Sequence, residues 1–167
     1  TATVAAPGDD PYVDAGSVSA TIASATGGNF ESLQINPAAA TTTVTDDVDA
    51  TTVSLSATAS VAEGGSIVYT ATLTSAADTP VTVTLSTGET ITIATGTTTG
   101  SVSIAAPAED PYIDAGSVSR TITAATGGNF ESLIVNPAAA TTTVTDTIGV
   151  TTVSITGDAI VAEGATA

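Results

Sequence analysis

Apolar and polar residues alternate along most of this chain. Between residues 50 and 149 the alternating apolar positions form seven runs, at 53–55, 67–73, 81–85, 91–93, 102–106, 118–122 and 133–135. Gly, Asn, Asp and Pro residues, which favour turns, gather between the runs. A period of two is typical of β-strands that bury one face. The pattern therefore predicts an all-β fold of seven strands arranged as a β-sandwich.

The chain also repeats itself at long range. Residues 7–45 recur at 107–145, with DPYVDAGSVS in the first copy and DPYIDAGSVS in the second. Recurrence of a domain-sized block is the signature of a tandem array. We therefore expect residues 1–49 to be the C-terminal half of a preceding repeat, 50–149 to be a complete β-sandwich repeat, and 150–167 to be the first strands of a following repeat.

Two places depart from the alternation. Arg120 occupies an apolar position of its predicted strand, so we expect it at an edge or a pole where its side chain reaches water. The apolar parity also shifts between Val135 and Val144. A bulge or a change of sheet near Asn136 and Pro137 would explain this shift, because proline cannot donate a ladder hydrogen bond.

The composition excludes several classes of function. The chain has one Lys or Arg, no His, no Cys and a net charge of −16. Phosphate binding needs cationic side chains, so we expect no nucleic-acid partner. The usual catalytic bases and nucleophiles are missing, and an aromatic content of 3% is too low for a sugar-processing cleft, so we expect no enzyme. No apolar run reaches about 18 residues, which predicts no membrane insertion in this stretch.

The acidic residues fall where a β-sandwich would gather them. If seven strands alternate up and down, the loops after strands one, three and five share one pole with the end of strand seven. In residues 50–149 these positions hold Glu63, Glu109, Asp110, Asp114 and Asp146, with Glu89 further into the following strand. The corresponding pole of the preceding repeat would hold Asp9, Asp10, Asp14 and Asp46. We therefore predict a cluster of carboxylates at the end of each repeat.

These carboxylates call for a cation that the protein itself does not supply. Like charges crowded at one pole repel, and the chain has a single basic side chain. Ca²⁺ is the matching ion, since it takes about six to eight oxygen ligands in flexible geometry, whereas Mg²⁺ demands a tighter octahedron. The competing interpretation is a solvated acidic surface that keeps the chain soluble. We favour that interpretation for Asp78, Glu31, Glu131 and Asp158.

Two short segments carry a family resemblance. The run VAEGGSIVYT at 61–70 and the run TVTDD ending at Asp47 resemble Calx-β domains and the immunoglobulin-like extender repeats of large bacterial RTX adhesins, the biofilm-forming LapA type. The resemblance implies tandem seven-stranded Greek-key β-sandwiches in an extended rod. It also implies that Ca²⁺ binds at the domain's end, at positions that match Glu63, Glu109 with Asp110, and Asp46 with Asp47. The second terminal copy departs from this pattern and reads Asp146-Thr147.

The terminal acids run into the next repeat with almost no linker, from Asp46 to Thr51. A cation held between two units would fix their relative angle and turn a jointed string into a rod. We therefore expect a calcium-rigidified extender, or stalk, of a secreted or cell-surface bacterial adhesin, which projects a distal binding domain for cell adhesion and biofilm formation. Its partners would be the neighbouring repeats. An extracellular location follows because calcium there is high enough to saturate weak sites.

Two alternative functions stay open at this point. The Thr-rich faces of the strands could bind glycan, ice or a partner adhesin, although Thr at alternate positions is also the ordinary outward residue of a sheet. The repeat could instead build a surface filament or layer, in which case it would self-associate laterally.

Overall fold

The structure is a computed structural model that describes residues 2–14, 16–157, 159–160 and 162–164. Within these residues the protein is all-β, as the alternation predicts, and no helix has the length and apolar character needed to cross a membrane. Asp158, which we expected at the surface, lies outside the described residues. The described strands are β1 (Gly16–Ala20), β2 (Ala40–Val44), β3 (Ala50–Ala57), β4 (Ser60–Ala62), β5 (Ser66–Leu73), β6 (Val81–Leu85), β7 (Thr90–Ile93), β8 (Thr99–Ala105), β9 (Gly116–Arg120), β10 (Ile122–Gly127), β11 (Ser132–Val135) and β12 (Ala140–Thr145).

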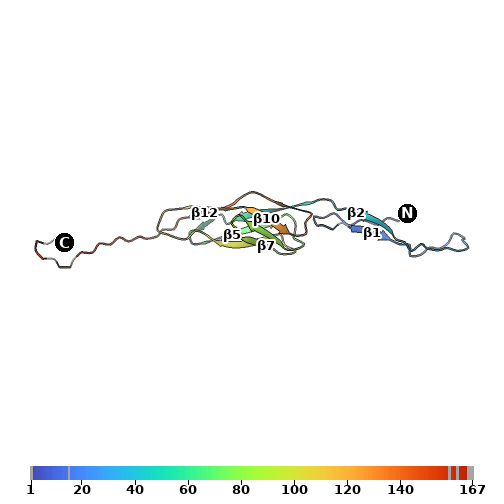
Figure 1. Ribbon diagram of the computed structural model, residues 1–167, viewed down its shortest axis with the longest axis horizontal. Helices are drawn as coiled ribbons and strands as arrows, with labels where there is room; N and C mark the ends of the chain where they lie inside the picture. Colours follow the sequence, from blue (N-terminus) through green and yellow to red (C-terminus); the bar gives the residue numbers. More distant parts are fainter. Residues whose placement is uncertain (1, 15, 158, 161, 165–167) are drawn as a thin grey trace.

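The molecule is elongated. Figure 1 shows the β1–β2 hairpin, a central unit of residues 50–149 and the C-terminal residues following one another along the long axis. We refer to residues 2–49 as the N-terminal unit. Every residue of the central unit is described, so its topology can be stated in full.

The central unit contains three sheets. One has four strands in the order β11-β3-β5-β8, and the other two have three strands each, in the orders β10-β6-β7 and β4-β12-β9. Only Thr121 separates β9 from β10, so one continuous passage of the chain connects the two smaller sheets. The sheets share one apolar core, whose fully buried side chains include Val53, Tyr69, Val81, Val83, Ile91 and Ile93.

The chain changes sheet where its apolar parity shifts. β11 pairs in parallel with β3, over Ser132–Val135. β12 then pairs with β9 and β4 in a different sheet. The turn between them begins with Asn136, whose side-chain oxygen accepts the amide of Ala138 at 2.9 Å. The predicted change of sheet near Asn136 and Pro137 is confirmed.

The structure adds three strands to the seven predicted runs, β4, β10 and β12. All three consist mainly of Ala, Thr, Ser and Gly, whose small side chains leave no clear apolar period. In β12 the inward face includes Thr142, which is fully buried and donates its hydroxyl to the carbonyl of Thr58 at 2.6 Å. Threonine therefore occupies a core position here because its hydroxyl finds an acceptor.

Arg120 ends β9, an outer strand of its sheet, opposite Ala140. Its side chain is half-buried, and one guanidinium nitrogen, Nη1, donates to the carbonyl of Ser119 at 3.0 Å. The edge position agrees with the expectation, but only part of the side chain reaches water.

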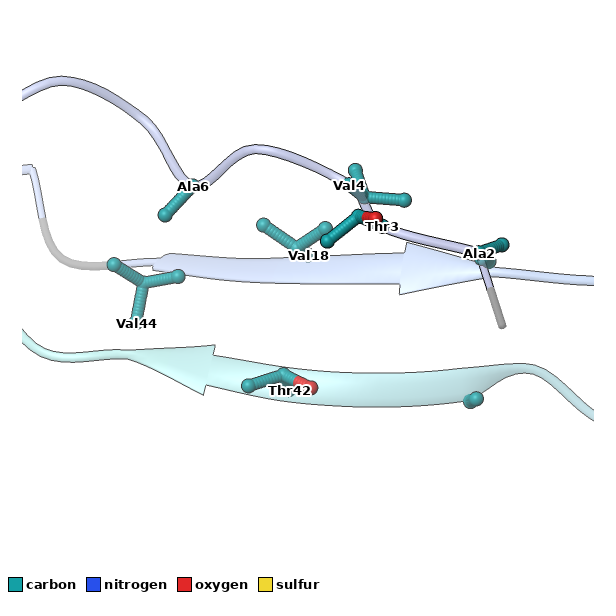
Figure 2. A pocket seen from close by; sticks show the side chains of 9 residues that line it. Ala2, Thr3, Val4, Ala6, Val18, Thr42 and Val44 are labelled. Carbon is teal, nitrogen blue, oxygen red and sulfur yellow. The ribbon is translucent and has the colours of Figure 1, made fainter.

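The N-terminal hairpin reproduces the pairing of its copy in the central unit. β1 and β2 pair antiparallel in the same register as β9 and β12. Residues 2–6 lie along this hairpin and enclose an apolar groove of about 350 Å³, lined by side chains that include Val4, Val18 and Val44 (Figure 2). In the central unit the copies of the groove residues from β2, at 140, 142 and 144, are buried. The groove is therefore the counterpart of a core face.

Candidate metal centre

Three strand ends bring three carboxylates together at one end of the central unit. Glu63 follows β4, Asp114 precedes β9, and Asp146 follows β12. β12 lies between β4, which runs parallel to it, and β9, which runs antiparallel. All three residues therefore lie at the same end of these strands. One carboxylate oxygen from each residue lies within 4.8 Å of the other two. These residues are three members of the predicted acidic pole.

Backbone hydrogen bonds hold Glu63 in place. Its amide donates to the carbonyl of Thr145 at 3.1 Å, and the next amide, that of Gly64, donates to the carbonyl of Pro107 at 2.7 Å. The amide of Thr147 reaches Oε2 of Glu63 at 3.5 Å. The side chain of Glu63 is buried, with 7% of its surface exposed. Glu63 is therefore fixed between the loop of residues 106–115, which we call the acidic loop, and the end of β12.

The neighbouring carboxylates perturb the ionisation of Glu63. A hydrogen bond with Asp114 and burial raise the pKa of Glu63 to about 7, and the charges of Asp114 and Asp146 add to this rise, whereas the amide of Thr147 opposes it. Crowded carboxyls keep a proton in this way when no cation neutralises them. A cation bound at this position would compete with that proton for the same oxygen atoms.

The oxygen atoms at this end suit a hard cation. Oδ1 of Asp146 and Oγ1 of Thr147 are buried without a hydrogen-bond partner, which is unusual for polar atoms in a folded protein. Two oxygen atoms on one Ca²⁺ lie at most about 5 Å apart, because each is about 2.3 to 2.6 Å from the ion. The carboxylate oxygen atoms of the three residues, one from each, lie within 4.8 Å of one another, which fits this span. Glu63, Asp114 and Asp146 would be the residues that hold the ion.

Glu109 and Asp110 lie in the same acidic loop but outside this group of three. Oδ1 of Asp110 accepts the amide of Tyr112 at 2.8 Å and closes a local turn. Glu109 lies against Gly149, where an added Cβ would be 3.4 Å from Oε1 of Glu109 and 3.0 Å from the backbone of Pro111. The acidic loop is thus packed against the chain that leaves β12, and both acids border the site without joining the group.

Glu89 lies at the other end of β9, away from this group. It sits in the turn between β6 and β7, where the amide of Ser86 donates to the carbonyl of Thr121. The hydroxyl of Thr87 donates to the Glu89 carboxylate. This hydrogen bond and the backbone amide of Glu89 lower its pKa, the charge of Arg120 does so too, and burial opposes them. Glu89 therefore lies near Arg120, the only Lys or Arg of the sequence.

The acidic residues of the N-terminal unit also gather. The amide of Asp14 donates to Oδ2 of Asp46 at 3.2 Å. Asp10 accepts the amide of Tyr12 at 3.0 Å, in the same turn that the second copy forms. A cleft of about 150 Å³ lies at this point, and its lining includes Asp9, Asp14, Asp46 and Asp47. The structure thus brings four of the five predicted residues of this unit to one cleft.

Two acids that we did not predict as metal ligands, Asp49 and Glu131, join this N-terminal cluster. The amide of Asp49 donates to the side chain of Glu131, which also shares a hydrogen bond with Asp46. Glu131 is half-buried, with Oε1 enclosed and unpartnered, and not part of a solvated surface as expected. No signal along the chain could have identified it, because Glu131 belongs to the central unit and Asp46 to the N-terminal one.

Like charges dominate this N-terminal cluster, which lies at the junction of the N-terminal and central units. The charge of Asp49 does most to raise the pKa of Asp9, followed by burial and by the neighbouring aspartates. The amide of Asp49 lowers the pKa of Glu131, but burial and the hydrogen bond and charge of Asp46 outweigh it, so the pKa is raised. The surroundings of Asp9 and Glu131 in this cluster therefore oppose the ionisation of these two side chains.

These features define a class: an all-β protein whose sequence recurs in tandem and whose strand ends carry clustered carboxylates. The family model of the LapA domain matches residues 1–47 and, a second time, residues 49–147. The chain therefore belongs to the LapA domain family. LapA is a biofilm adhesin, and membership associates the chain with biofilm adhesion and with a cell-surface or extracellular location. No curated protein and no solved structure matches the chain.

Proposed function

We propose that this chain is a calcium-rigidified extender segment of a secreted or cell-surface bacterial adhesin. In this proposal, units joined end to end carry Ca²⁺ at their poles and project a distal binding domain for adhesion and biofilm formation. The neighbouring units of the same chain are the partners, and no catalysis is involved. The supporting observation is the convergence of Glu63, Asp114 and Asp146, together with the buried and unpartnered Oδ1 of Asp146.

The topology supports an immunoglobulin-like, Calx-β-like Greek-key sandwich as the repeating unit. If β3 with β4, β9 with β10, and β11 with β12 are each counted as one strand interrupted midway, the central unit has seven strands. Such interruptions let one strand serve both layers of a sandwich. Each unit of the proposed array would repeat this arrangement.

The junction between the units supports a stiffening role for calcium. Glu131 of the central unit meets Asp46 and Asp49 at the end of the N-terminal unit. Carboxylates from two units thus share one cluster. Without a cation their charges push the units apart, whereas a bound divalent ion would draw them together. Calcium would then control the angle between units.

The proposed location agrees with this use of calcium. Calcium sites of extracellular modules bind with a Kd of about 10⁻⁴ to 10⁻³ M, and extracellular calcium is high enough to fill them. Binding to the folded state alone raises stability, so a chain without disulfides gains stability from the ion outside the cell.

Calcium titration of the whole chain tests the proposal. We expect calorimetry to detect binding and the unfolding temperature to rise with calcium. Asp146→Asn should lose most of the heat of binding at the central pole. Asp78→Asn makes the same chemical change at an exposed site and should bind calcium as the unmodified chain does. The absence of binding heat, with equal unfolding temperatures in calcium and in chelator, would contradict the proposal.

The alternative functions give different results in two further assays. A unit that itself binds glycan, ice or a partner adhesin would be retained on glycan arrays or on ice. A filament or layer subunit would associate laterally in sedimentation experiments. The extender proposal expects neither outcome.

A further inference from the structure

Two short motifs that occur in both copies of the repeat meet across the junction. One is Asp-Pro-Tyr at 10–12, in the acidic loop of the N-terminal unit, and the other is Gly-Gly-Asn-Phe-Glu at 127–131, between β10 and β11 of the central unit. Tyr12 stacks on Phe130, with ring centroids 5.8 Å apart and an angle of 22° between the ring planes. The backbones of these two residues also form an isolated antiparallel bridge.

Three hydrogen bonds fix the register of this contact. The amide of Val13 donates to the carbonyl of Asn129 at 3.0 Å, and the amide of Glu131 donates to the carbonyl of Pro11 at 3.2 Å. The hydroxyl of Tyr12 donates to the carbonyl of Ala76 at 2.7 Å. Backbone hydrogen bonds on both sides of a stacked ring make this contact specific and similar to the pairing of two β-strands.

The central unit builds the receiving surface from its own residues. Phe130 is 9% exposed and belongs to the core, with Tyr12 packed against it. The turn that carries Phe130 requires glycine, because Gly128 has a φ of +87° and an added Cβ there would lie 2.2 Å from the Phe130 ring. The turn of the central unit itself therefore fixes the backbone that carries the Phe130 ring.

The second copy of the Asp-Pro-Tyr loop, at 110–112, forms the same turn, but no aromatic ring of the described residues stacks on its tyrosine. The amide of Tyr112 donates to Oδ1 of Asp110 at 2.8 Å, as that of Tyr12 does to Asp10 at 3.0 Å. Tyr112 is nevertheless 73% exposed, and the next residue, Ile113, is 95% exposed. An open groove of about 400 Å³ lies beside them, lined also by Pro111 and by residues 146–149 and 151.

We propose that the Tyr112 loop is a docking surface whose occupant is the Gly-Gly-Asn-Phe turn of a second copy of the central unit. The observed contact of Tyr12 supplies the pattern. The Tyr112 ring stacks on the copy of Phe130, its hydroxyl donates to the copy of the Ala76 carbonyl, and the Ile113 amide donates to the copy of the Asn129 carbonyl. Each unit thus carries a tyrosine plug at one pole and a phenylalanine socket at the other.

This inference rests on the proposed function only in treating the chain as part of an array. The contact itself consists of neutral rings and backbone groups, so it needs no metal ion. The contact also brings Glu131 beside the N-terminal acids, since Glu131 follows the socket directly in the chain. The plug therefore acts as a pivot between units, and a bound cation would supply a second point of attachment.

Hydrogen exchange of the whole chain in chelator first tests the contact between Tyr12 and the central unit. The Val13 amide should be protected, and the Ile113 amide should exchange freely. Tyr12→Ala should remove the protection of Val13 by at least about tenfold in rate, and Tyr12→Phe should remove less, because it keeps the stack. Tyr112→Ala is the matched control and should leave Val13 unchanged. Unprotected Val13 in the unmodified chain would overturn the inference.

A longer chain, in which a copy of residues 68–149 follows Ala167, tests the new surface. The added segment completes the repeat that begins at residue 150, so this chain contains a second complete unit. We expect Ile113 to become protected in chelator by at least about tenfold, and Tyr112→Ala to abolish that protection. Free exchange at Ile113 in this longer chain, or protection that appears only with calcium, would overturn the docking surface. Protection in chelator together with no calcium binding would instead refute the proposed function and leave the docking surface standing.

Discussion

In the proposed function, a proton and a calcium ion would compete for the carboxylate of Glu63. The hydrogen bond with Asp114 and burial raise the pKa of Glu63 from 4.5 to about 7. In the folded chain without metal, the carboxyl keeps its proton up to neutral pH, whereas the unfolded chain releases it near pH 4.5. The same oxygen atoms are the ones that would hold calcium.

In chelator, the chain should lose stability as the pH rises through this interval. The folded state binds the Glu63 proton more tightly than the unfolded state does, so the stabilisation is full below pH 4.5 and is lost as the pH passes about 7. Glu63→Gln cannot titrate and should flatten this part of the profile. Urea unfolding at pH values from about 4 to about 8 measures the difference.

Glu163→Gln is the matched control for this experiment. Glu163 stands in the same Ala-Glu-Gly sequence as Glu63 and is exposed, so its replacement should leave the pH profile unchanged. Excess calcium should also flatten the profile of the unmodified chain, because the ion displaces the proton. Identical slopes for the unmodified chain and Glu63→Gln would show that another group is responsible.

Glu131 tests the junction in a similar way, because its copy Glu31 is exposed. Glu131→Gln removes a charge beside Asp46 and Asp49. We expect it to weaken calcium binding at the N-terminal cluster by about tenfold, as loss of a ligand or of its close support does. Glu31→Gln should have no effect in the same calorimetric titration. Equal affinities for the two variants would remove Glu131 from the site.

At the scale of elements, the turn at Gly128 offers a stability test. Gly128→Ala places a Cβ in a backbone with φ +87° and within 2.2 Å of the Phe130 ring. Gly88→Ala imposes a similar backbone strain, at φ +94°, but meets no atom within 4 Å. We expect Gly88→Ala to cost about 1 to 2 kcal/mol in unfolding free energy, and Gly128→Ala about 1 to 3 kcal/mol more. Equal costs in urea unfolding would contradict the close packing of Phe130.

The alternation predicts those elements whose apolar residues are large. It identifies the runs that become β5, β6 and β7, and the parity shift near Asn136 correctly predicts a change of sheet. It fails where small or hydroxylated residues face inward. β10 reads as Ala, Thr and Gly, and Thr142 is a buried residue of polar type. Such positions depend on a tertiary hydrogen bond that no local pattern contains.

The candidate site was predictable to the extent that strand direction fixes which loops share an end. That reasoning brings Glu63, Asp114 and Asp146 together, as the structure has them. It also assigns Glu89 to that end, which is wrong, because the turn between β6 and β7 lies at the opposite end of β9. It also misses Glu131, whose partners belong to another unit.

At the scale of the whole molecule, two kinds of contact connect the N-terminal and central units. The stacked pair of Tyr12 and Phe130 is neutral and holds one side of the junction. The acidic cluster around Glu131 and Asp46 lies next to it and carries unbalanced negative charge. In the proposed function, the first contact would act as a pivot in the absence of calcium, and the repulsion within the acidic cluster would push the two units apart. With calcium, both would hold, and the elongated form in Figure 1 would become rigid.

Small-angle X-ray scattering of the whole chain, recorded in calcium and again in chelator, shows whether calcium stiffens the array. We expect a long, well-defined maximum dimension in calcium, and a shorter or broadened distance distribution once the ion is removed. Asp46→Asn should resemble the chelated state even in calcium. Superimposable scattering profiles in calcium and in chelator would contradict the claim that calcium stiffens the array.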